Sequence, residues 1–120
     1  MEIQAIRGAT QIAEDNPEMM KGAVVELMAE ILRANALQSQ DLISVIFTAT
    51  QDLVSDFPAA SARAMGLGDV PLLCAVEIAV PGSMQRVIRT LIHCRTTRSQ
   101  KQMVHVYLRG TNKLRNDLAQ

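Results

Sequence analysis

The sequence predicts a single α+β domain over residues 1–120, built as a mixed five-stranded β-sheet with one long and one short helix on one face. Five short segments are rich in alternating or β-branched apolar residues, which is typical of strands. One longer segment repeats apolar residues at helical spacing, and a short Ala-rich segment ends in two glycines. The length suits one domain, and the chain shows no linker or internal repeat.

The first strand and the long helix are predicted near the start of the chain. Residues 3–12 alternate loosely, as a strand does, until a polar break interrupts them. Asp15 or Asn16 suits the helix cap, Pro17 suits the first helical position, and Glu18 lies where the helix dipole favours an acid. The helix is expected to run to about Ala36, with an apolar face made of Met20, Val24, Leu27, Met28 and Ile31.

The middle of the chain predicts a strand, the short helix and another strand. Residues 41–50 form a short β-branched run, which indicates a buried central strand. The short helix is expected over residues 58–65, closed by Gly66 and Gly68. Residues 70–79 then predict a third strand that runs into a turn at Pro81-Gly82.

The last two strands are predicted in the final third. For residues 85–94, the spacing of Ile88 and Leu91 with the preceding Met84 would also suit a helix, but four of the ten residues are β-branched, which favours a strand. Residues 105–109 predict the fifth strand, and a flexible polar tail is expected from about Gly110. A sheet with so few helices has a second apolar face to bury, so we expect identical subunits to pack on it.

The charge balance hides a strong asymmetry. The chain carries 12 basic and 12 acidic residues, but residues 1–80 hold four bases against eleven acids, and residues 81–120 hold eight bases against one acid. A basic segment suggests nucleic acid. This interpretation is disfavoured because Tyr107 is the one aromatic residue there and no nucleic-acid-binding motif is present. We therefore expect no nucleic-acid partner.

The sequence also restricts the compartment and the chemistry. Its longest apolar stretches are strand-sized, so no membrane partner is expected. Cys74 and Cys94 lack metal-site spacing and no secretion signal is visible, which predicts a reduced, cytoplasmic location. No nucleophile–base set, metal motif or phosphate-binding glycine loop is found. We therefore expect neither a metal nor a cofactor.

Arginines among apolar segments are the residues that suggest a site. An arginine in a strand is costly to bury unless it meets an anion, and its planar fork matches a carboxylate. The candidates Arg7, Arg63, Arg89 and Arg115, together with Glu77, Cys74 and Tyr107, predict a pocket for a small polyanion.

Each candidate also has a purely structural interpretation. Arg7 can pair with a core carboxylate, and Arg89 can reach water from an edge strand. Cys74 is by default a small buried hydrophobe, Glu77 a salt-bridge partner of an arginine, and Tyr107 a core ring. The residues alone therefore specify no reaction.

Seven blocks of sequence resemble a known family. They are, in order, Ile6-Arg7-Gly8-Ala9-Thr10, Phe47-Thr48-Ala49-Thr50 with Asp52-Leu53, Phe57-Pro58-Ala59 with Arg63, Val70-Pro71 through Cys74 to Glu77, Val87-Ile88-Arg89, His105-Val106-Tyr107-Leu108, and Leu114-Arg115 with Asp117-Leu118. Together, in register over residues 3–118, they resemble the monofunctional, trimeric α/β-barrel class of chorismate mutase.

The resemblance implies a homotrimer with a pseudo-α/β-barrel core and three active sites at subunit interfaces. It implies an isomerase on the route to phenylalanine and tyrosine, which rearranges chorismate to prephenate in one pericyclic step. Such a step needs no nucleophile, metal or proton carrier, so the absence of catalytic motifs fits it. The enzyme contributes the reactive conformer and a field for the separating charge.

The resemblance also implies residue roles. Arg89, Glu77 and Arg7 would be catalytic: Arg89 at the ether oxygen, Glu77 accepting from the ring hydroxyl with help from Cys74, and Arg7 holding a carboxylate with Tyr107. The remaining substrate-binding positions would be the apolar wall of Phe57, Ala59 and Leu73, and the mouth residues Arg63, Leu114 and Arg115.

Three points depart from a simple match. Cys74 and Glu77 are three residues apart, so they line one pocket only if the strand ends or bulges between them. Ala60 stands where the family often has a charged residue, and Asn116 stands where proline is common. Two alternatives stay open at this point, a non-catalytic trimeric binding or regulatory protein for a small dicarboxylate and the nucleic-acid module above.

Overall fold

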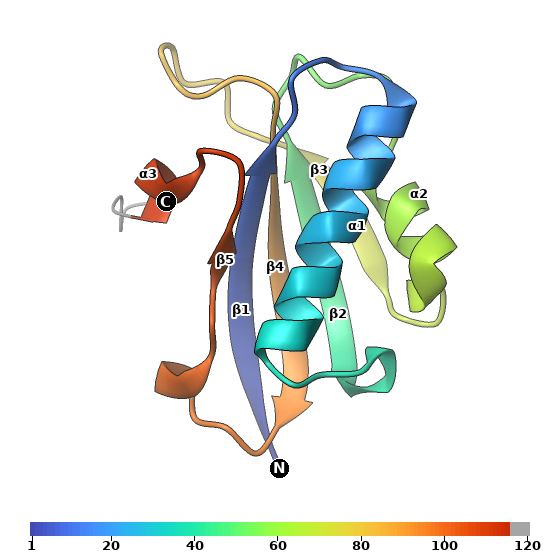
Figure 1. The fold of residues 1–120 in the computed structure, drawn as a ribbon, viewed down its shortest axis with the longest axis vertical. Coiled ribbons are helices and arrows are strands. Elements are labelled where there is room, and N and C mark those ends of the chain that lie inside the picture. Colours follow the sequence, from blue (N-terminus) through green and yellow to red (C-terminus); the bar gives the residue numbers. More distant parts are fainter. Residues whose placement is uncertain (116–120) are drawn as a thin grey trace.

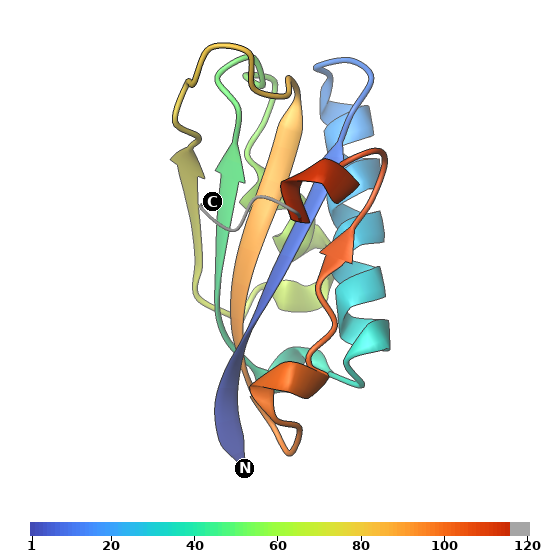
Figure 2. The same ribbon diagram turned by 90° about the vertical axis from the view of Figure 1, so that its left-hand side faces the viewer.

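The fold is a five-stranded mixed sheet with its two larger helices on one face (Figures 1 and 2). We describe residues 1–115 of a computed structural model. The strands are β1 (Glu2–Gln11), β2 (Leu42–Ala49), β3 (Leu72–Val76), β4 (Val87–Thr96) and β5 (Val106–Tyr107). The helices are α1 (Pro17–Ala34), α2 (Pro58–Ala62) and α3 (Asn112–Arg115). The predicted α+β class and five-stranded mixed sheet are confirmed.

The strand order is β3-β2-β4-β1-β5. Strand β4 runs antiparallel to both of its neighbours, β1 and β2, whereas the outer pairs β2–β3 and β1–β5 are parallel. The segment over residues 85–94 is therefore a strand, as β-branching favoured, and it lies at the centre of the sheet. The predicted central strand of residues 41–50 is β2, one place from the centre.

Helix α1 begins as predicted. Asn16 caps it, since its side-chain oxygen accepts from the backbone N–H of Met19 at 2.8 Å, and Pro17 occupies the first turn. The apolar face of α1 packs on β1 so closely that a Cβ atom at Gly8 would lie 2.7 Å from Ile31 Cδ1. The buried residues of α1 are Met20, Ala23, Val24, Leu27, Met28 and Ile31.

The short helix α2 continues into a single π-helical turn over residues 63–67. Gly66 breaks this turn with a φ of 105°, a left-handed conformation that favours glycine, as its predicted closing role requires. Gly68 keeps a right-handed conformation, with a φ of −65°, and α2 itself ends at Ala62 rather than at residue 65. The predicted Pro81-Gly82 turn also forms, with Gly82 at a φ of 83°.

Three elements differ from prediction. Strand β3 ends at Val76 rather than continuing to residue 79, and β5 has two residues rather than five. Both strands lie at sheet edges, where pairing with a single neighbour limits their length. The tail predicted from Gly110 begins instead with a turn and α3 (Figure 1). The rest of that tail, including Asn116, lies outside the described residues.

The sheet face opposite α1 and α2 is not covered by any helix of the described chain except where α3 approaches β5 (Figure 2). Several large apolar side chains are exposed on this face or along the β3 edge and the loop after it, namely Ile3, Phe57, Leu73, Val76, Ile78 and Val80. Within residues 1–115, none of the helices has the length and apolar character needed to cross a membrane.

Candidate active site

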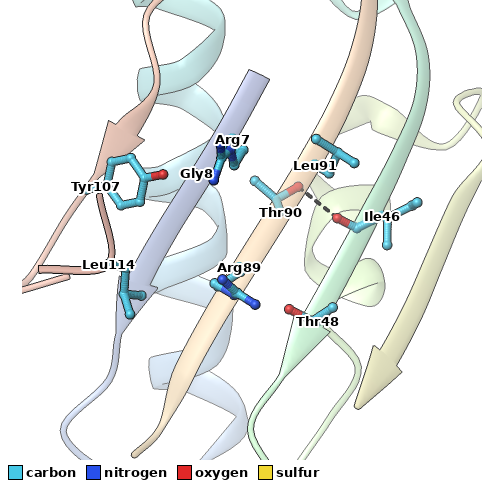
Figure 3. Close-up of a pocket in the computed structure, with 9 residues that line it drawn as sticks. All are labelled: Arg7, Gly8, Ile46, Thr48, Arg89, Thr90, Leu91, Tyr107 and Leu114. Carbon is cyan, nitrogen blue, oxygen red and sulfur yellow. Dashed lines mark hydrogen bonds between the residues drawn. The ribbon is translucent and has the colours of Figure 1, made fainter. Parts of the chain in front are cut away.

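A pocket of about 220 Å³ lies on the uncovered face of the sheet. Figure 3 shows Tyr107 on β5, Arg7 on β1, Arg89 on β4 and Thr48 on β2, in order across four adjacent strands, with α1 behind the sheet. Leu114 of α3 adds an apolar side chain at its edge, and the remaining lining residues are Gly8, Ile46, Thr90 and Leu91.

Strand alternation decides which side chains reach this pocket. Ile88 and Ile92 of β4 are fully buried beneath the helices, and the intervening Arg89 and Leu91 therefore point to the other face. In the sheet register, Arg89 is paired with Ala9 of β1 and with Thr48 of β2. A guanidinium is thus fixed near the middle of the uncovered face by the two strands on either side of it.

Glu77 neutralises Arg89 in the structure. The Nε of Arg89 donates to Oε2 of Glu77 at 3.0 Å, and its second terminal nitrogen donates to Oε1, which gives a bidentate fork. The hydroxyl of Thr48 also donates to Oε2. Partial burial alone would raise the pKa of Glu77, but the hydrogen bonds from Arg89 and Thr48 and the charge of Arg89 outweigh burial and hold it below its usual range.

Arg7 and Tyr107 approach the pocket from the other side. The backbone N–H of Arg7 donates to Nδ1 of His105 at 2.9 Å, and the N–H of Leu108 donates to the carbonyl of Ala9 at 2.9 Å. These bonds hold β5 against β1, so that the Tyr107 ring lies beside Arg7 (Figure 3). Two cationic groups and a phenol therefore face one concave, partly apolar space, which suits a small anion with more than one acidic group.

Helix α3 is attached to β1 by a buried threonine. The Thr111 side chain is fully buried, and its hydroxyl lies 2.8 Å from the carbonyl of Leu108 and 3.2 Å from that of Ala9. Its own carbonyl accepts from the N–H of Leu114 at 2.9 Å. Leu114 consequently reaches the pocket. Arg115 ends α3, and its side chain lies outside the described part of the chain.

The remaining predicted residues form a separate group within one chain. Phe57 and Cys74 line another hollow, of about 510 Å³, beside the β3 edge. Leu73 is 61% exposed and Arg63 is also exposed, whereas Ala59 is buried in the core. The structure therefore brings Arg7, Glu77, Arg89, Tyr107 and Leu114 together, and it does not bring Phe57, Ala59, Arg63, Leu73 or Cys74 to the same pocket of the same chain.

The comparisons with known proteins agree with one another. Residues 3–118 match the family model described as chorismate mutase type I. The chain belongs to the chorismate mutase type I family.

Similar proteins cover nearly the whole chain. The chorismate mutase AroH of Thermus thermophilus is 49% identical over 117 residues, which are 97% of this chain and 96% of that protein. The chorismate mutase AroH of Bacillus subtilis strain 168 is 34% identical over 120 residues, 99% and 94% of the two chains. The solved structure of a chorismate mutase from Clostridium thermocellum matches with a TM-score of 0.89 at 40% identity and covers 91% of this chain and 97% of that one.

Membership of the chorismate mutase type I family confirms the resemblance and the isomerase class predicted from seven sequence blocks. The sequence required the strand to end or bulge between Cys74 and Glu77, and β3 does end between them, at Val76. The backbone N–H of Glu77 donates to the carbonyl of Ala49 at 2.9 Å, and its side chain turns to Arg89.

Two threonines near the site were not among the predicted residues. Thr48 belongs to a block that carried the resemblance, and strand alternation with Ile46 would have placed it on the face of Arg89. Thr111 had no comparable signal, because its role depends on a tertiary contact with β1 about a hundred residues earlier.

Proposed function

We propose that the pocket between Arg7, Arg89 and Tyr107 rearranges chorismate to prephenate. The observation that carries this proposal is the guanidinium of Arg89, held at the centre of a concave face by Glu77 and by two neighbouring strands. In this isomerisation one C–O bond breaks as one C–C bond forms, so atoms, protons and electrons balance within a single molecule. A site of fixed charges and shape is enough for such a step.

Arg89 stabilises the charge that separates in the transition state. As the ether bond breaks, negative charge accumulates on its oxygen, and a donor already aimed at that position needs no reorganisation. The fork with Glu77 orients the Arg89 side chain before substrate arrives. Because a guanidinium has five N–H donors, Arg89 can turn some of them to the ether oxygen and to a carboxylate.

The remaining polar groups orient the substrate. Arg7 and Tyr107 hold one carboxylate from the β1–β5 side of the pocket. Glu77 is ionised at neutral pH and accepts a hydrogen bond from the ring hydroxyl. Leu114, anchored through Thr111, and Arg115 close the mouth. Together these contacts favour the compact conformer in which the two carbon atoms that will bond are close.

A neighbouring subunit supplies the rest of the site in a homotrimer. The exposed apolar residues beside β3 require cover, and Phe57, Leu73, Cys74 and Arg63 lie there rather than in their own chain's pocket. We propose that these residues complete the pocket of an adjacent copy, with Ala59 of the core supporting the turn that carries Phe57. We also propose a cytoplasmic location, where the free thiols of Cys74 and Cys94 stay reduced.

The test is an assay of the purified wild-type protein. Loss of the diene absorbance of chorismate, with prephenate as the product, is the expected result. Chorismate that binds in calorimetry but is not consumed would instead indicate the binding or regulatory protein. Neither binding nor consumption at micromolar protein would contradict the assignment of the pocket.

A further inference from the structure

Glu77 is held by side-chain contacts rather than by a strand. It follows the last residue of β3, and its backbone N–H donates to the carbonyl of Ala49 at the end of β2. A glutamate side chain in this position has rotamers to choose from and needs partners to select one. Its side-chain partners Arg89 and Thr48 come from the neighbouring strands β4 and β2 and are paired with each other in the sheet register.

The two partners differ in what they do during the reaction. Oε1 of Glu77 accepts from Arg89, whereas Oε2 accepts from both Arg89 and the Thr48 hydroxyl. When Arg89 turns donors to the substrate, its fork with Glu77 is weakened. The Thr48 hydroxyl has no competing task of this kind, so it continues to hold Oε2.

We infer that Thr48 is a positioning residue, whose hydroxyl fixes the Glu77 carboxylate as acceptor for the substrate's ring hydroxyl while Arg89 serves the ether oxygen. This inference rests on the proposed function. On this inference, the hydroxyl donor of residue 48 is what matters for activity. Serine keeps the hydroxyl, whereas valine keeps the shape of threonine and removes the donor.

The pH dependence of turnover separates this role from simple packing. Among the described residues, the charged groups around Glu77 are Arg89 of β4, which binds it, and Asp52 of the loop after β2, which lines an adjoining hollow with it. Arg7 of β1 lies in the same pocket as Arg89. The Thr48 hydroxyl bonds to the ionised form of Glu77 and therefore lowers its pKa. Removing that donor raises the pKa, so the acidic limb of the activity profile should move to higher pH.

The experiment compares Thr48→Val and Thr48→Ser with wild type by kcat and KM between about pH 4 and pH 8. We expect Thr48→Val to lose about tenfold in kcat/KM and to shift the acidic limb upward, and Thr48→Ser to stay within about threefold of wild type. Thr10→Val is the matched control. The Thr10 hydroxyl is buried on β1 without a hydrogen-bond partner among the described residues, and it lies outside the pocket, so this variant should keep the wild-type profile.

Three results would overturn the inference: Thr48→Val with wild-type kcat/KM and pH profile, an equal loss in Thr48→Ser, or a loss without a shift of the acidic limb. Circular dichroism checks folding, and Thr48→Ala replaces the valine variant if valine does not fold. If wild type itself consumes no chorismate, the proposed function fails instead. The inference is then still tested by the NMR-detected pKa of Glu77, which should rise in Thr48→Val and stay unchanged in Thr10→Val.

Discussion

At the scale of single residues, Arg89 and Glu77 form a salt bridge with each other, and we propose that both also bind the substrate. The sequence left Glu77 either as a salt-bridge partner or as a substrate ligand, and the structure shows the salt bridge. The two roles are compatible because the pair is only partly buried, with 30% of the Arg89 side chain and 18% of the Glu77 side chain exposed. Both groups can therefore exchange contacts with a bound molecule.

The pair should also make stability depend on pH. The folded state holds the pKa of Glu77 below its usual range, so its stabilising contribution is complete above about pH 5 and is lost as pH falls through the lowered pKa. Glu77→Gln removes this ionisation. The difference in unfolding free energy between wild type and Glu77→Gln, measured with urea, should shrink as pH falls from about 6 to about 3. A difference in unfolding free energy that stays constant over this pH range would show that the ionisation of Glu77 does not contribute to stability.

The site was predictable to the extent that local rules apply. Alternation along β4 puts Arg89 on the sheet face opposite to that of the buried Ile88. The need for a strand end before Glu77 followed from the three positions that separate it from Cys74 in the sequence. Thr48 was missed because its importance lies in a contact with a residue 29 positions away. Ala59 was predicted as a wall residue, but within one chain it packs in the core.

At the scale of elements, the packing of α1 on β1 requires a glycine. A Cβ atom at Gly8 would lie 2.7 Å from Ile31 Cδ1 and 3.1 Å from Thr90 Cγ2, and both of those residues are buried. Gly8→Ala should therefore lower the unfolding free energy by about 1–3 kcal/mol through overpacking.

Gly22→Ala is the matched control for this substitution. A Cβ atom there meets nothing within 4 Å, and alanine is the better helix former, so this variant should gain about 0.5–1 kcal/mol. Urea or thermal unfolding measures both variants. Equal effects of the two substitutions would show that the close approach of α1 to β1 at Gly8 is not a constraint.

The anchoring of α3 gives a second prediction at this scale. Thr111→Val removes the buried hydroxyl that bonds to the carbonyls of Ala9 and Leu108, and leaves those acceptors with one partner fewer. We expect a loss of about 1–2 kcal/mol in unfolding free energy and a KM for chorismate raised severalfold, with a smaller change in kcat, because Leu114 is positioned less well. Thr111→Ser, which keeps the hydroxyl, should retain most of the wild-type unfolding free energy and a KM close to that of wild type. A raised KM in the serine variant as well would argue against the hydroxyl as the anchor.

Helix α1 was more predictable than the edge strands. Its start depends on a cap and a proline within a few residues, and these signals are local. Strand β3 ends together with β2 beside it, and β5 is followed by a turn in which Arg109 and Gly110 have positive φ angles. The sequence of an edge strand does not reveal either ending. Helix α3 was missed for a related reason, since a helix of four residues is stabilised by its contact with β1.

At the scale of the whole molecule, the uncovered face of the sheet holds the pocket, and it is the surface on which we propose that other copies pack. The sequence predicted that a sheet with one long helix must bury its second face, and the exposed Phe57, Leu73, Val76 and Ile78 show where that surface lies. The basic residues of the last third of the chain have different locations. Arg89 lines the pocket, whereas Arg95 and Lys101 are exposed within this chain.

Hybrid trimers test whether subunits share a site. The wild-type assembly should have a mass of about 39 kDa, three times the 13.1 kDa chain. Arg89→Ala should inactivate a pocket from one side, and Phe57→Asp, at an exposed position, should inactivate the pocket of a neighbour by repelling the dianion. Refolded together in equal amounts, the two inactive variants should recover up to about a quarter of wild-type activity, because about a quarter of the interfaces combine two intact halves.

The controls for this experiment are each variant refolded alone and the mass of every mixture by light scattering. Activity near zero in a mixture that is trimeric would show that each pocket works within one chain. A monomeric wild-type protein would remove the shared site altogether.

The turnover number of Arg89→Ala tests the central claim most directly. Arg33→Ala is the matched control, since Arg33 also forks a glutamate, Glu30, but on the exposed side of α1 away from the pocket. If Arg89 stabilises the developing charge, Arg89→Ala should lower kcat by about 10²-fold or more, and Arg33→Ala should leave it unchanged. An Arg89→Ala protein that is folded and keeps kcat within a few-fold of wild type would contradict the account.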